Sequence, residues 1–227
     1  MTSRLRLSGR RVAPGVLAGG LSAALLLSLV SGALAAGAGN VVAANGTVAG
    51  HSYAYWLARN WQASYKVSGP ATACRTLTAN GQRVAWLMPP SVAPRTYAYT
   101  CSEPAGRSLD VIELSNECST FDGDHNGFGT TAADLQRCAR MGFKGVRETT
   151  TIDGDFVDVS KLIAATGAYR VHASKNNMLG QSPGHGLSAA YGYALLIDGF
   201  SKGTHTIHTI ASVGTLRWDI TYTVQAG

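Results

Sequence analysis

The chain has 227 residues, with 19 Lys and Arg, 13 Asp and Glu, and a formal net charge of +6. Four of the basic residues and none of the acidic ones lie within residues 1–35, so the formal net charge of the rest is only +2. This weak charge argues against a partner such as nucleic acid, which needs Lys and Arg clustered on the folded part. The remaining length suits one ordinary domain.

The first 35 residues have the pattern of a bacterial secretory signal peptide. Arg4, Arg6, Arg10 and Arg11 precede an apolar run over 15–34, which closes with Ala33-Leu34-Ala35. We expect Sec-type export, cleavage after Ala35, a secreted location and no stable membrane span afterwards. A retained anchor is the alternative, because an apolar run of about 20 residues also spans a bilayer.

The next segment, 36–50, is small and polar and is predicted to be a flexible leader to a single domain over 51–227. A helix is predicted from Ser52, as its N-cap, to a stop at Gly69-Pro70. Its large side chains recur at helical spacing, which favours core packing over sugar binding: Tyr53, Trp56, Leu57, Trp61 and Tyr65.

Beyond this helix the chain changes to short runs rich in β-branched and aromatic residues. Asp153-Gly154 between two runs predicts a hairpin, and 216–224 alternates apolar and polar residues, so one face should be buried. The predicted strands are 83–88, 95–101, 108–114, 145–152, 156–159, 169–174, 191–198, 204–211 and 216–224.

A second helix is predicted from Thr131 to Met141, where Thr131 and Asp134 form a start like a capping box. Residues 175–189 are predicted to form a long polar loop. Many strands and two short helices predict a mainly β fold, an antiparallel β-sandwich of the jelly-roll or immunoglobulin type.

The four cysteines, Cys74, Cys101, Cys118 and Cys138, are an even number in an exported chain, which predicts disulfides. They permit three connectivities, and the sequence alone does not choose among them. Sequential pairing is favoured because each pair flanks a turn-rich connection. A zinc site is disfavoured because no C-x2-C spacing occurs.

Asp122, Asp124 and Asn126 place oxygen ligands at alternate positions around glycines, as a calcium loop does. The twelfth position, where such a loop needs a bidentate acid, is Ala133. A polar turn without a cofactor is therefore the favoured interpretation, with calcium as the alternative.

No G-x-S-x-G motif or spare thiol suggests covalent catalysis. His205 and His208 should point to opposite faces of a strand, so they should not share a metal. Two carboxylates would suffice for a glycosidase, and the chain offers five candidates: Glu103, Asp110, Glu113, Glu117 and Glu148. Of these, Glu113 and Glu117 are expected to face solvent or to lie in loops.

Several short segments resemble a family of uncharacterised secreted bacterial proteins, often labelled only as signal proteins. The segments are Gly50-His51-Ser52-Tyr53 with Trp56 and Trp61, Cys101-Ser-Glu-Pro-Ala-Gly106, Ser115-Asn-Glu-Cys118, Ala132–Ala139 and Gly203-Thr-His-Thr-Ile-His208. Asn60-Trp61 stands where that family has two tryptophans. The resemblance implies a secreted β domain with no known activity, and its cysteine order supports the sequential pairing.

The sequence favours a non-catalytic domain, a binding or structural module of the cell envelope. The alternative is a secreted hydrolase acting on glycans, whose acids and histidines, such as His185, converge only in the fold. A cleft that gathers two of the five carboxylates would favour the hydrolase.

Overall fold

The computed structural model describes residues 40–68, 74–88, 93–111, 113–122 and 129–227. The chain divides into two units, Met1–Ala33 and Leu34–Gly227, and all described residues belong to the second. The described residues are mainly β, with two α-helices and three sheets, which confirms the predicted fold class. None of the described helices is long and apolar enough to cross a membrane.

The first sheet has the order β1-β2-β4-β11. Asn80 and Gly81 form the tight turn between β1 and β2, and both have positive φ, at 50° and 75°. The three residues of β4 and of β11 are all buried. The strands are β1 (Cys74–Ala79), β2 (Gln82–Leu87), β4 (Leu109–Val111) and β11 (Leu195–Ile197).

The second sheet is centred on β10, which pairs with β5 on one edge and with β8 and β9 on the other. Its strands are β5 (Ser115–Ser119), β8 (Ile163–Ala165), β9 (Tyr169–Ala173) and β10 (Gly184–Tyr193). A single 3₁₀ turn, η2 (Val159–Lys161), precedes β8.

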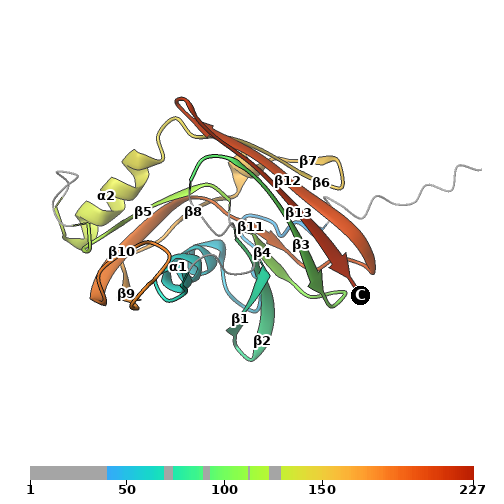
Figure 1. Cartoon of the computed structure of the whole chain (residues 1–227), viewed down its shortest axis with the longest axis horizontal. Helices are drawn as coiled ribbons and strands as arrows, with labels where there is room; N and C mark the ends of the chain where they lie inside the picture. Colours follow the sequence, from blue (N-terminus) through green and yellow to red (C-terminus); the bar gives the residue numbers. More distant parts are fainter. Residues whose placement is uncertain (1–39, 69–73, 89–92, 112, 123–128) are drawn as a thin grey trace, which may run out of the picture. The chain divides into compact units, whose positions relative to one another are not determined.

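The third sheet has the order β3-β13-β12-β6-β7 and contains the long β12–β13 hairpin drawn in orange and red in Figure 1. Alternate residues of β13, from Ile220 through Tyr222 to Val224, are buried, as the predicted alternation requires. The strands are β3 (Thr96–Glu103), β6 (Arg147–Ile152), β7 (Asp155–Val157), β12 (Gly203–Val213) and β13 (Leu216–Ala226).

Helix α1 (Tyr53–Ser64) is drawn in Figure 1 between the strands of the second sheet and those of the first. Tyr53, Trp56 and Leu57 join one core with residues of the first and third sheets, which confirms the predicted core face. The helix ends at Ser64, before the predicted stop. That stop, Gly69-Pro70, lies outside the described residues.

Helix α2 (Ala132–Gly142) begins with the predicted capping box, because the Thr131 and Asp134 side chains each bond the other's backbone N–H. The disulfides join Cys74 to Cys101 and Cys118 to Cys138, which is the sequential pairing. The first links β1 of the first sheet to β3 of the third, and the second links β5 to α2.

The segment 40–50, part of the predicted flexible leader, is held in place by the first sheet. Val41 bridges Ile197 of β11, and Val42 N donates to Leu196 O at 2.9 Å. Val48 is 2% exposed. The leader prediction is wrong here, since backbone bonding to β11 supplies the contacts that these small side chains cannot.

Three further sequence expectations need correction. The predicted 175–189 loop contains the start of β10 from Gly184, where small residues pack closely under Thr120 and Phe121. The predicted strand 191–198 is divided between β10 and β11. The sandwich is not wholly antiparallel, because β3 pairs with β13, and β2 with β4, in parallel.

Candidate functional site

A cleft of about 420 Å³ lies between α1, β5, the C-terminal end of α2 and the β12–β13 hairpin. Most of its lining is apolar or aromatic, including Leu57, Trp61, Phe143, Tyr193 and Trp218. A volume of this size suits a small molecule, and a mainly apolar wall with a few polar groups is typical of ligand sites.

Trp61 is held in the cleft wall by a hydrogen bond from its indole Nε1 to Ser115 Oγ, at 3.2 Å. The helical stripe that positions Tyr53 and Leu57 in the core thus places its next aromatic side chain, Trp61, at the cleft. Trp61 packs against the core, as predicted for the whole stripe, and it also lines the cleft, which the sequence did not indicate.

Glu113 and Glu148 form a buried carboxyl pair beside this cleft, and Glu113 lines it. Thr209 Oγ1 donates to Glu113 Oε1 at 3.2 Å, and the backbone N–H of Leu114 donates to Glu148 Oε2 at 2.9 Å. Glu113 lies in the connection between β4 and β5, as one alternative expected, but it is only 4% exposed and does not face solvent. Strands β6 and β12, distant in the sequence, cover it.

Burial raises the pKa of Glu113 to about 7. Burial, and then the negative charge of Glu113, raise the pKa of Glu148 well above its ordinary value. Two carboxylates in one dry site repel each other, so the pair retains a proton near neutral pH. Glu113 Oε2 and Glu148 Oε1 are buried with no hydrogen bond to any other described residue.

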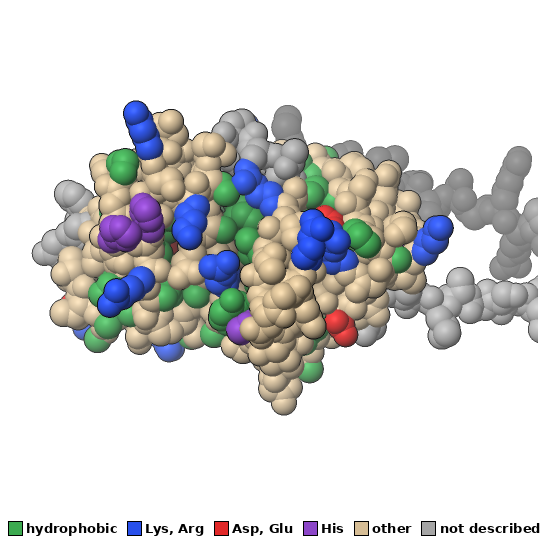
Figure 2. Space-filling model, turned by 90° about the horizontal axis from the view of Figure 1, so that it is seen from below, with side chains coloured by type: hydrophobic (Ala, Val, Ile, Leu, Met, Phe, Trp, Pro, Cys, Tyr) green, Lys and Arg blue, Asp and Glu red, His purple; other side chains and the backbone are tan. Residues whose placement is uncertain are grey.

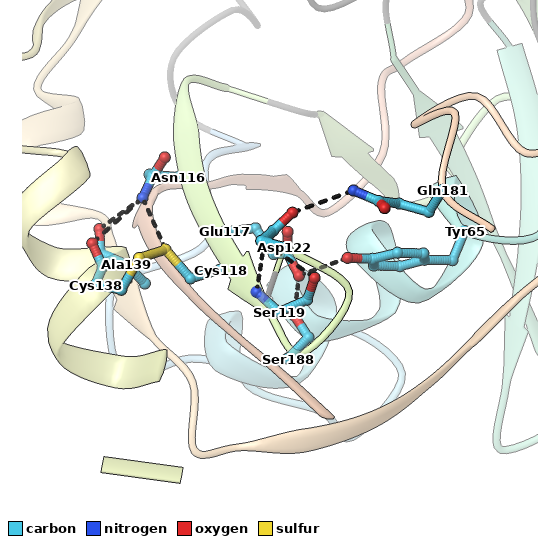
Figure 3. Close-up of a disulfide and its surroundings, with 10 residues drawn as sticks. All are labelled: Tyr65, Asn116, Glu117, Cys118, Ser119, Asp122, Cys138, Ala139, Gln181 and Ser188. Atoms are coloured by element: carbon cyan, nitrogen blue, oxygen red, sulfur yellow. Dashed lines mark hydrogen bonds between the residues drawn. A yellow bond between two sulfur atoms is a disulfide. The ribbon is translucent and has the colours of Figure 1, made fainter. Parts of the chain in front are cut away.

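Glu117 of β5 is the second acid that lines the cleft. Its Oε1 accepts hydrogen bonds from Tyr65 Oη, at 2.9 Å, and from Ser188 Oγ (Figure 3). Ser188 Oγ is also 3.0 Å from Tyr169 Oη. Glu117 is half-buried and lies on β5, so the prediction that it faces solvent or lies in a loop is wrong. Burial raises its pKa to about 7.

Asn116 connects β5 to the end of α2 beside the Cys118–Cys138 disulfide, as Figure 3 shows. Its Nδ2 donates to Ala139 O at 3.2 Å. A Cβ at Gly142 would lie 2.3 Å from the same nitrogen, so a larger residue there would displace the Asn116 amide. The disulfide and this amide together fix the α2 side of the cleft.

The other candidate acids lie away from the cleft lining. Asp110 is fully buried, accepts a hydrogen bond from Asn60 Nδ2 at 3.2 Å, and has its pKa raised to about 7 by burial. Glu103 pairs with Arg107 at 2.7 Å. The structure thus pairs Glu113 with Glu148, places Glu113 and Glu117 in the lining of one cleft, and leaves Asp110 and Glu103 outside that lining.

His205 and His208 point to different surroundings, as their strand spacing predicts. His205 is buried between Phe200 and Asp153, with its Nδ1 2.7 Å from Asp153 Oδ2. His208 is partly exposed and lies 2.9 Å from Asp219 Oδ1.

His172 and His185 form a cross-strand pair on β9 and β10, with ring centroids 4.3 Å apart. Neither lines the cleft. Figure 2 shows histidine side chains gathered on one face, among separate Lys and Arg side chains. The convergence of His185 with another histidine therefore occurs away from the acids.

The calcium hypothesis concerns a segment that is only partly described. Asp122 accepts hydrogen bonds from Ser119 N, at 2.9 Å, and from Gln181 Nε2, at 3.1 Å (Figure 3). Asp124 and Asn126 lie outside the described residues. Among the described residues no group of three or more His, Cys, Asp or Glu could hold a metal. Calcium binding stays a prediction.

No family model and no curated protein matches the chain. Among solved structures, it is similar to PbICP-C, determined in complex with falcipain-2, at 11% identity and a TM-score of 0.26. The similarity covers 63% of this chain and 98% of that one. A likeness at this level supports no conclusion about function.

Proposed function

We propose that this chain is an exported, non-catalytic binding module of the bacterial cell envelope that holds a small, mainly apolar ligand. The cleft of about 420 Å³, with Trp61, Trp218 and Tyr193 in its wall, carries the proposal. Burial of apolar ligand surface against such a wall is the main favourable contribution to binding. The two disulfides fit an oxidising compartment.

Filling the cleft tests this function. Val213 lines the cleft, whereas its neighbour Ser212 does not, because successive strand residues point to opposite faces. We expect a neutral fluorescent probe, N-phenyl-1-naphthylamine, to bind the wild-type protein. Val213→Trp should weaken that binding at least tenfold, and Ser212→Trp should leave it unchanged. Equal binding by both variants would contradict the proposal.

Export is tested separately by the mass of the protein recovered from the culture medium. Cleavage after Ala35 predicts an N-terminus at Ala36. Recovery of the uncleaved chain in the membrane fraction would favour the retained anchor instead.

A glycan hydrolase is the second candidate, because two of the five predicted acids, Glu113 and Glu117, line one cleft. A pKa of about 7, as burial gives both, suits a general acid. This function predicts release of reducing ends from bacterial envelope glycans and its loss in Glu117→Gln. No release by the oxidised wild-type protein would exclude it for those glycans.

A further inference from the structure

The charged groups of the cleft have one sign. Its described lining includes Glu113 and Glu117, and no Lys, Arg or His. The aromatic side chains Trp61, Trp218 and Tyr193 line the same space. Aromatic faces attract cations through their quadrupole, and they do so more strongly where water is excluded. Acids and aromatic rings together therefore favour a positively charged guest.

Of the two acids, Glu113 is the one with unused hydrogen-bonding capacity. Glu117 accepts from Tyr65 and Ser188. Glu113 accepts from Thr209 at Oε1, and its Oε2 has no donor beyond its contact with Glu148 of the carboxyl pair. A second negative charge on this buried pair is costly in free energy, and a guest that supplies a charged donor offsets that cost.

The groups around Glu113 supply no positive charge of their own. Glu148 comes from β6, Thr209 from β12, and Tyr222 from β13, where its buried hydroxyl also has no described partner. Burial, and then the negative charge of Glu148, raise the pKa of Tyr193 of β10. The pair therefore balances its charge by keeping a proton.

We propose that the cleft binds small organic cations, with a primary ammonium paired to Glu113 and an apolar body against Trp61 and Trp218. This inference rests on the proposed binding function and names its ligand class. The ammonium keeps its three protons and donates one hydrogen bond to the Glu113 carboxylate, which lines the cleft. The proton that the carboxyl pair held passes to solvent, so charge is conserved and no covalent bond to carbon changes.

The test uses three probes that share a six-carbon chain: n-hexylamine, 1-hexanol and hexanoate. Calorimetry of the oxidised wild-type protein at pH 7.5 should show hexylammonium binding at least tenfold more tightly than hexanol, with hexanoate weakest. Titrations in phosphate and in Tris should reveal proton release on binding of hexylammonium alone. Its affinity should fall at pH 5.5, where Glu113 is protonated before binding.

Glu113→Gln should remove the preference for hexylammonium and the proton release, while hexanol still binds. Asp155→Asn removes the charge of an exposed acid on β7 and should leave both unchanged. Equal affinity of the wild-type protein for hexanol and hexylammonium would overturn this inference and leave the binding function intact. Failure of all three probes to bind would overturn both the cation inference and the proposed binding function. Both results are measured on the wild-type protein, so they do not depend on whether the variants fold.

Discussion

At the scale of single residues, buried acids set how stability varies with pH. Burial raises the pKa of Asp110, Glu113 and Glu117 to about 7 in the folded protein. Between the ordinary carboxyl pKa and pH 7, the folded state binds more protons than the unfolded state, so the free energy of unfolding falls as pH rises. The domain should therefore be more stable at pH 5 than at pH 8.

Glu117→Gln isolates one of these contributions. The amide oxygen can still accept from Tyr65 and Ser188, but it does not ionise. Between pH 5 and pH 8 the free energy of unfolding should fall in both proteins, but it should fall by roughly 2–3 kcal/mol less in the variant than in the wild-type protein. The difference follows from the raised pKa of Glu117, since one pKa unit is about 1.4 kcal/mol. Urea unfolding at both pH values measures this difference. A variant with the full wild-type pH dependence would contradict the assignment.

The burial of these acids was not predictable from local sequence. Glu113 is covered by Thr209 and Glu148, which come from β12 and β6, and only the paired sheet brings them together. Acids are usually exposed, so the sequence pointed to solvent. By contrast, the spacing of His205 and His208 correctly predicted that the two rings lie in different surroundings, because the alternation of side chains along a strand is a local property.

At the scale of elements, the two helices differ in how they begin. Thr131 caps α2 with a side-chain hydrogen bond from Asp134 N, at 3.3 Å, whereas Ser52 occupies the N-cap of α1 without a side-chain bond. Thr131→Ala should therefore destabilise the domain by about 1 kcal/mol. Ser52→Ala, its matched control, should change stability by much less. Guanidinium unfolding distinguishes the two, and equal losses would contradict this difference.

The disulfide between β5 and α2 constrains a sequence separation of 20 residues. Replacing Cys118 and Cys138 together by serine should cost roughly 3 kcal/mol by the chain-entropy estimate. Because Asn116 and Gly142 flank this disulfide at the cleft, the variant should also bind N-phenyl-1-naphthylamine more weakly. Replacing Cys74 and Cys101, away from the cleft lining, should lower stability with less effect on binding. The reverse order of binding losses would contradict this placement.

Element type was largely predictable, and pairing was not. The period of four in α1, the capping box of α2 and the alternation in β13 are all local patterns. The parallel pairings of β3 with β13 and of β2 with β4 join segments that are apart in the sequence. The residue pattern of each strand does not show which other strand it pairs with. Asn80-Gly81 is a hairpin signal that would have located β1.

At the scale of the whole molecule, metal dependence is tested by thermal unfolding of the oxidised protein. The polar-turn interpretation of Asp122, Asp124 and Asn126 predicts the same Tm in EDTA and in millimolar calcium. In that interpretation Asp122 already has Ser119 and Gln181 as partners. A rise in Tm that follows the calcium concentration would show binding by mass action and favour the calcium loop.

The parallel pairing of β3 with β13 also affects how the chain folds. Thr96 pairs with Asp219, so β3 cannot join the third sheet until a distant part of the chain is present. Pairings of such long range slow folding, because loop closure costs entropy before any contact compensates for it. The Cys74–Cys101 disulfide can form earlier, within a much shorter segment. Oxidation would then hold β3 beside β1 while β13 arrives, so we expect refolding to be faster from the oxidised than from the reduced chain.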